Sequence, residues 1–237
     1  MILTLSNLKK ELQTLADKNQ AVILQRFFKT GKGQYGEGDV FLGIKVPIQR
    51  KVAKKYTRLT LGDISQLLAS PIHEYRLTAL FILIAQYDRG NENDKQKIFE
   101  LYLKNAKNVN NWDLVDLSSP NIVGKHLLQK NRVILYDLAK SKNLWKERIA
   151  ILATFEFIKN GESKDALAIA RILLNSDQDL IHKAVGWMLR EIGKRIGEAA
   201  EEKFLKIHYR TMPRTMLRYA IERFSEEKRK RYLYGQI

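Results

Sequence analysis

Three stretches of the chain share one pattern: HEYRLTALFILI at 73–84, KERIAILATFEF at 146–157 and IHKAVGWMLREI at 181–192. Apolar residues recur in each at i, i+3, i+4 and i+7, the period of an α-helix that buries one face. The helical period covers four longer segments: 6–29, 71–88, 144–159 and 178–195. Since no segment alternates with a period of two, the sequence predicts an all-α fold.

The helical segments also recur at regular intervals along the chain. Steps of 36 residues reach a helical segment each time: Arg76, Trp112, Arg148, Ala184 and Ala220. Units of about 35–45 residues, each a pair of helices, are typical of HEAT-like α-solenoids. We therefore expect one HEAT-like repeat domain over 1–237 with a concave, basic face. Chance similarity among amphipathic helices is the alternative.

The composition of the chain favours one class of partner and excludes several kinds of site. The 237 residues include 42 Lys and Arg against 26 Asp and Glu, a formal charge of +16. Such a charge favours a polyanionic partner, most often nucleic acid, although a solvated basic surface is the alternative. The absence of cysteine excludes disulfides, Cys-ligated zinc and thiol nucleophiles, and a reducing cytoplasm is the simple expectation. Neither a signal peptide nor a transmembrane run is recognisable.

Several familiar motifs lack the context that they require. The segment GKGQYGEGD at 31–39 matches G-x-G-x-x-G, but a helical segment precedes it, so we interpret it as a flexible connector. The four histidines show no metal-ligand spacing, and neither a nucleophile elbow nor a Walker loop is present. No metal and no cofactor are therefore implied. The basic run KRKR at 228–231 fits a phosphate contact or a solvated tail.

Two residues lie on unexpected faces of their predicted helices. Trp187 falls roughly 130° from the apolar stripe of its helix, among basic residues. It is either a surface aromatic for a nucleic acid or a residue covered by a neighbouring repeat. Arg148 lies on an apolar stripe and needs a partner, for which Asp116 or Asp113 is a candidate. A phosphate is an alternative partner, and a purely structural ion pair is a further one.

A third group of interest is NVNNWDLVDLSSP at 108–120. Trp112 and Asp116 are four residues apart and would share one helix face. Asp113 lies near the expected helix start, where a carboxylate is stabilised by the helix dipole. An aromatic side chain and a carboxylate on one face can form a site with an aromatic wall and an anionic floor. An exposed Asp beside a core Trp is the more common arrangement.

Together these segments resemble AlkD-type alkylpurine DNA glycosylases. The resemblance rests on five segments that occur in the same order: FLGIKVPIQRK at 41–51, WDLVD at 112–116, ERIAIL at 147–152, HKAVGWMLRE at 182–191 and MPRTMLRYAIE at 212–222. It implies a HEAT-like α-solenoid that hydrolyses the N-glycosidic bond of N3- or N7-alkylated purines in duplex DNA. It also implies an abasic product, without deep flipping of the damaged base.

The resemblance assigns roles to four residues. Asp116 matches the catalytic carboxylate, Trp112 and Trp187 match two cleft aromatics, and Arg148 matches the cleft arginine. Phe27 stands where some members have a tyrosine near the DNA. The basic residues expected to bind phosphates are Lys45, Arg50, Lys51, Lys183, Arg190 and Lys194.

The departing base is cationic and needs no strong general acid, whereas a carboxylate can stabilise the oxocarbenium-like sugar. We expect a monofunctional, cofactor-free monomer. A non-catalytic HEAT-like nucleic-acid-binding protein and a scaffold for an acidic partner are the alternatives.

Overall fold

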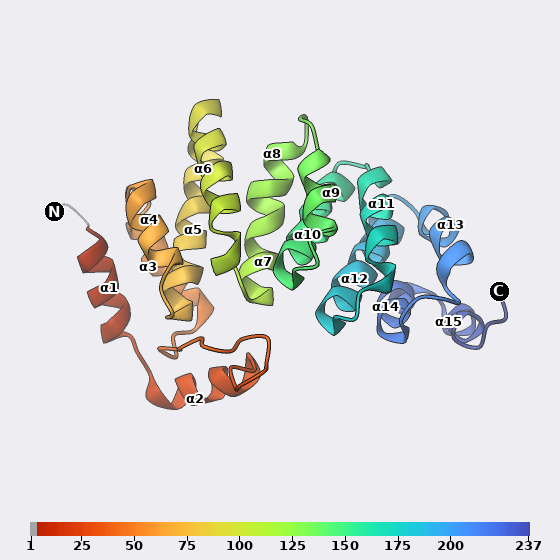
Figure 1. Ribbon diagram of the computed structural model, residues 1–237, viewed down its shortest axis with the longest axis horizontal. Helices are drawn as coiled ribbons and strands as arrows, with labels where there is room; N and C mark the ends of the chain where they lie inside the picture. The colour runs from red at the N-terminus through yellow and green to blue at the C-terminus, as the bar shows by residue number, and fades with distance from the viewer. Residues whose placement is uncertain (1–3) are drawn as a thin grey trace. The chain divides into compact units, whose positions relative to one another are not determined.

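Helices supply the regular structure of residues 4–237, the part of the chain that this computed structural model describes (Figure 1). These residues contain no β-strand; Val40 and Ile72 form an isolated parallel bridge. The fold class is therefore all-α, as the helical period predicts. None of the described helices is long and apolar enough to cross a bilayer.

The chain divides into two compact units, Met1–Ser118 and Ser119–Ile237. The helices of the first unit are α1 (Leu5–Thr14), α2 (Lys18–Phe27), α3 (Val46–Lys55), α4 (Leu61–Leu68), α5 (His73–Arg89), α6 (Glu92–Lys104), the 3₁₀ turn η1 (Ala106–Asn108) and α7 (Trp112–Ser119), which reaches the boundary.

The second unit begins with a short π-helical turn. Its elements are η2 (Pro120–Gly124), α8 (Lys125–Leu127), α9 (Val133–Ala139), α10 (Leu144–Lys159), α11 (Lys164–Ile172), η3 (Leu173–Asn175), α12 (Asp179–Arg195), α13 (Glu198–His208), α14 (Arg214–Ala220), η4 (Ile221–Arg223) and α15 (Glu226–Leu233).

The 36-residue steps correspond to real helices. The five positions fall in α5, α7, α10, α12 and α14, and other helices lie between them in the chain. In the first unit, α5 packs against α3, α4 and α6, and Leu80 and Leu83 are completely buried there. In the second, α10 packs against α9 and α12, and α12 against α14. Neighbouring helices thus share cores in the manner of a helical-repeat solenoid.

One predicted helix is wrong in its extent. The segment 6–29 forms two helices, α1 and α2, separated at Leu15–Asp17. Asp17 caps the second helix, because its carboxylate accepts the backbone N–H of Gln20 at 3.0 Å. A capping side chain of this kind starts a new helix even where the apolar spacing continues.

Close helix packing in the second unit depends on Gly186. A Cβ atom at this position of α12 would lie 2.5 Å from the carbonyl oxygen of Met216 and 2.5 Å from Cβ of Tyr219. Glycine therefore lets α14 approach α12 more closely than any other residue would. The apolar stripe beside it, Ile181, Val185, Met188 and Ile192, is buried as predicted.

Candidate active site

Trp112 and Asp116 lie one turn apart on α7, and both side chains are half-buried. They therefore share a helix face, as their spacing predicts. Tyr102 of α6 lies close to this helix and shares a hydrogen bond of 2.9 Å with Ser118 Oγ. Burial raises the pKa of the Tyr102 hydroxyl, and the negative charge of Asp116 raises it further. The charge of Asp116 on α7 therefore reaches the buried hydroxyl of Tyr102 on α6.

The rings of Phe27 and Phe28 pack against the Trp112 ring. Its ring stacks on Phe28 with 5.2 Å between centroids and 25° between planes, and Phe27 meets it edge-on at 5.9 Å. The indole Nε1–H donates to the Tyr35 hydroxyl at 3.3 Å. Tyr35 belongs to the glycine-rich segment 31–38, so this connector is attached to Trp112 and folds into hydrogen-bonded turns.

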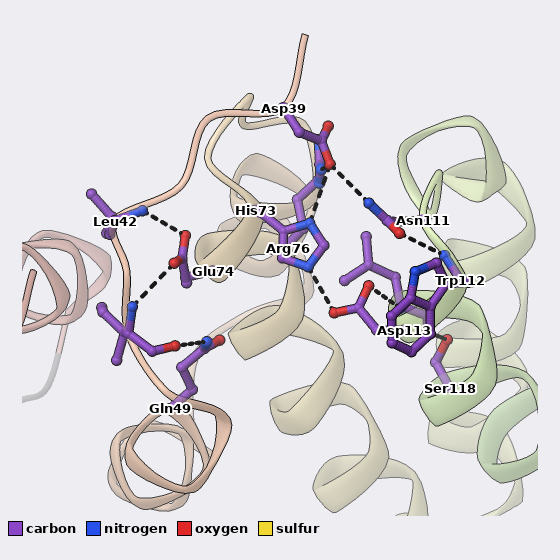
Figure 2. A network of polar contacts seen from close by, with 12 residues as sticks. Asp39, Leu42, Gln49, His73, Glu74, Arg76, Asn111, Trp112, Asp113 and Ser118 are labelled. Atoms are coloured by element: carbon purple, nitrogen blue, oxygen red, sulfur yellow. Dashed lines mark hydrogen bonds and ion pairs between the residues drawn. The ribbon is translucent and has the colours of Figure 1, made fainter. Parts of the chain in front are cut away.

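A buried polar network lies beside the start of α7 (Figure 2). His73 Nε2 is 2.8 Å from Asp113 Oδ2, and His73 Nδ1 is 3.2 Å from Asp39 Oδ2. Arg76 Nη2 forms an ion pair with Asp39 at 2.6 Å. Burial would raise the pKa of Asp39, but His73 and Arg76 outweigh it and the pKa is lowered. Asp39 is therefore held as a carboxylate.

Glu74 holds the loop that precedes α3. Its carboxylate accepts the backbone N–H of Leu42 at 2.9 Å (Figure 2). It also accepts the N–H groups of Gly43 at 2.8 Å and Ile44 at 3.2 Å. Gly43 has φ +87°, a left-handed conformation that favours glycine. The sharp turn there directs three successive N–H groups toward one side chain.

A small cavity of about 60 Å³ opens beside Asp113. Its lining combines aromatic and polar side chains: Phe28, Phe41, Lys45, Gln49, His73 and Asp113. A water molecule occupies about 30 Å³ in the liquid, so the cavity has room for a few water molecules and not for a purine base.

Arg148 and Trp187 belong to the second unit. Arg148 is buried on α10, as predicted from its apolar stripe, and its guanidinium donates to the carbonyl of Leu180. Trp187 of α12 is half-buried, with its ring 6.0 Å from that of Phe155. Its Nε1–H donates to Glu191 at 3.4 Å. Trp187 therefore lies outside the buried stripe of α12, as its helical position predicts, and Phe155 of the neighbouring helix α10 covers part of it.

A family model for DNA alkylation repair enzymes matches residues 8–224 of the chain. The chain belongs to the DNA alkylation repair enzyme family. A solved structure described as a predicted DNA alkylation repair enzyme from Enterococcus faecalis matches it with a TM-score of 0.68 at 15% identity. The match covers 89% of this chain and 97% of the other, and it shows a shared fold. A search of curated protein sequences finds no match.

The six basic residues expected to bind phosphates in this DNA alkylation repair family member differ in their surroundings. Lys45, Arg50 and Lys51 are exposed at α3, with the Arg50 guanidinium 4.3 Å from the centre of the Phe81 ring. Lys194 is exposed on α12. Lys183 pairs with Asp179 at 2.6 Å, and Arg190 pairs with Glu222. These two cations must leave or share an acidic partner before they bind a phosphate.

Sequence reasoning missed the residues that hold α7 in place. His73 shows no informative spacing to other histidines, because its partners Asp39 and Asp113 lie 34 and 40 residues away in the chain. The sequence predicts Asp113 near the start of a helix, and its Oδ1 accepts the Leu114 N–H there at 2.9 Å. Its pairing with His73 is an additional role. The assignments of Asp116, Trp112, Trp187 and Arg148 to catalysis stay predictions.

Proposed function

We propose that this DNA alkylation repair protein is a glycosylase. It hydrolyses the N-glycosidic bond of N3- and N7-alkylated purines in duplex DNA and leaves an abasic site. Family membership supports alkylated DNA as the substrate. The observation that carries the reaction is the face of α7, where Asp116 lies one turn from the supported ring of Trp112.

The chemistry suits a single carboxylate. An N3- or N7-alkylated purine is cationic, so it leaves with the electron pair of the C1′–N bond as a neutral base. Positive charge then develops on the deoxyribose, where an ionised Asp116 stabilises it. A water molecule attacks C1′, and its proton passes to the carboxylate or to solvent. The reaction needs neither a cofactor nor a lysine nucleophile, which supports a monofunctional enzyme.

Binding divides into ring contacts and phosphate contacts. The face of Trp112 attracts the cationic nucleotide at about 0.5–2 kcal/mol. In the second unit, the assignment of Trp187 and Arg148 to DNA binding comes from the resemblance to AlkD-type glycosylases. Exposed cations such as Lys45 and Lys51 bind phosphates, so affinity falls as salt rises. We infer a monomer that acts in the cytoplasm, a compartment with which the cysteine-free sequence is compatible.

The damaged base is not taken into a deep pocket in this proposal. The cavity beside Asp113, which neither Trp112 nor Asp116 lines, has room for a few water molecules and is too small for a purine. The proposal that the nucleotide stays near the stacked bases, with Asp116 acting on the sugar, comes from the resemblance to AlkD-type glycosylases.

The test is release of free base from methylated duplex DNA that carries 3-methyladenine and 7-methylguanine. Wild-type protein should release both bases and leave strands that break only after alkali treatment. Asp116→Asn should lower the single-turnover rate by about 100-fold or more while DNA affinity changes little. Asp137→Asn, the same substitution at an exposed site on α9, is the matched control and should behave as wild type.

Each outcome has a distinct meaning. Base release that Asp116→Asn leaves intact would refute the assignment of the carboxylate and keep the activity. No release, with tight and salt-sensitive duplex binding, would replace the proposal with a non-catalytic DNA-binding protein. Weak DNA affinity even at low salt would favour an acidic protein partner.

A further inference from the structure

His73 is the first residue of α5, and its ring lies between two carboxylates. Nε2 is 2.8 Å from Asp113 Oδ2, and Nδ1 is 3.2 Å from Asp39 Oδ2, while the side chain is only 2% exposed (Figure 2). An ionised carboxylate only accepts hydrogen bonds. Both contacts are therefore hydrogen bonds at the same time only if both ring nitrogens carry a proton.

The same ring belongs to a stack of aromatic rings that ends at Trp112. Phe41 stacks on His73 with 4.5 Å between centroids, and Phe28 stacks on Phe41 at 5.1 Å. Trp112 then stacks on Phe28 at 5.2 Å. Contacts among aromatic rings of this kind fix orientation as well as burying apolar surface. A shift of the imidazole is thus transmitted to Trp112.

Polar contacts join the first turn of α7 to the same ring. Asn111 accepts the Trp112 backbone N–H at 2.8 Å and donates to Asp39 Oδ2 at 3.4 Å. Asp113 Oδ1 accepts the Leu114 N–H while its Oδ2 meets His73. The start of this helix is therefore attached to His73 through both of its carboxylate partners.

We propose that His73, protonated on both ring nitrogens, is a positioning residue that fixes the first turn of α7 and with it Trp112 and Asp116. The inference rests on the proposed function in one respect, the role of Asp116 in the reaction. His73 acts through Asp113 and the ring stack. Its contribution is to hold the carboxylate at the distance from C1′ that the reaction requires.

The charges around His73 keep it protonated at neutral pH. Burial would lower its pKa, but Asp113 and Asp39 outweigh burial and raise the pKa to about 8, against the opposing charge of Arg76. Two further charged side chains lie near the ring: Glu74, the next residue of α5, and Lys45, which lines the same small cavity. Above about pH 8 the ring loses one proton and one of its two hydrogen bonds, which frees the start of α7.

The experiment is the pH profile of single-turnover 3-methyladenine release from methylated duplex DNA, with DNA affinity measured alongside. Wild type should lose about tenfold in rate with a midpoint near pH 8, at constant affinity, since a misplaced group costs rate rather than binding. His73→Gln should be about tenfold slower at neutral pH and show no step near pH 8. The wild-type profile is informative even if the variant folds poorly.

Two control variants exclude other titrating groups. His208→Gln changes a half-buried histidine on α13 and should keep the step. Glu201→Gln removes a buried carboxyl whose pKa is also about 8 and should keep it too. A step that disappears with either control, or a wild-type rate that is flat through pH 8, overturns the proposal.

A second readout does not depend on activity. The Trp112 indole N–H resonance should shift with a midpoint near pH 8 in wild type and not in His73→Gln, because the ring stack connects the two side chains. If the wild type releases no base, a titrating Trp112 resonance retains the positioning role while the glycosylase proposal fails. An indole resonance that does not respond in that case overturns the positioning role as well.

Discussion

Glu201 is a buried carboxyl group without a hydrogen-bond partner for Oε1, and it should destabilise the protein at neutral pH. It lies on α13, is 2% exposed, and its Oε2 packs directly against Gly193. Burial raises its pKa, and the negative charges of Glu198 and Glu202 raise it further, to about 8. Nearby cations act in the opposite direction without reversing the shift.

The pKa fixes both the sign and the size of the effect. The native state holds a proton that the unfolded chain releases above its ordinary pKa of 4.5, so this group lowers stability as pH rises from 4.5 to about 8. At pH 7 the cost is about 3 kcal/mol, at 1.36 kcal/mol per pKa unit. Glu201→Gln keeps the shape of the protonated acid and cannot ionise. It should therefore stabilise the protein by about 3 kcal/mol at pH 7 and by less than about 1 kcal/mol near pH 5.

Urea unfolding followed by circular dichroism at the two pH values measures this difference. Glu202→Gln is the matched control on the same helix, because Glu202 pairs with Lys228 at 2.9 Å and bonds the Tyr232 hydroxyl at 3.1 Å. Burial acts against it, but these partners lower its pKa, so its loss should destabilise the protein at neutral pH. A Glu201→Gln protein no more stable than wild type at pH 7, or equally stabilised near pH 5, would refute the argument.

Three further substitutions test the packing and the buried charges. Gly186→Ala should lower stability by about 1–3 kcal/mol because its methyl group meets α14. Gly62→Ala, whose methyl group would make only an ordinary contact with Thr60 Oγ1 at 3.6 Å, should change little, and thermal unfolding compares the two. Asp39→Asn should lower the stability by about 3 kcal/mol at neutral pH, since it leaves the buried cations of His73 and Arg76 with one carboxylate fewer. The loss of stability should shrink below pH 3.8, the ordinary pKa of the carboxyl group, and an equal loss in acid would contradict this. Arg132→Lys keeps the charge but loses the guanidinium, which lies 3.9 Å from the Phe157 ring centre and donates to Glu162 and Asp165 at 2.7 Å each. Urea unfolding should show a loss of about 1 kcal/mol, and no loss would argue against a stabilising role for these contacts.

Local patterns predicted the fold well because helices and repeats are local features. The apolar period located α5, α10 and α12 nearly to their ends, and the 36-residue step identified a helix each time. The break between α1 and α2 escaped the period because one capping side chain, Asp17, overrode continuous apolar spacing.

The candidate site was predictable only where its residues share one helix. Trp112 and Asp116 follow from a spacing of four, whereas the His73 contacts join residues 34 and 40 positions apart. The sequence likewise predicts Arg190 as a phosphate ligand but gives no sign of its ion pair with Glu222, 32 residues later. Contacts at such separations depend on how the helices pack together, and local spacing patterns in a single sequence do not reveal that packing.

The three backbone N–H groups that meet Glu74 have a consequence for how this region tolerates sequence change. Main-chain donors are the same for every residue except proline, so Leu42 and Ile44 can be exchanged for other residues without losing these bonds. Proline at either position would remove one of them, and no other residue at position 74 except aspartate carries a carboxylate. A saturation library should therefore accept more residues at Leu42 than at Glu74, whereas Gly43 is restricted by its φ of +87° and Ile44 by the burial of its side chain. Part of the information that defines this loop thus resides 30 residues away from it.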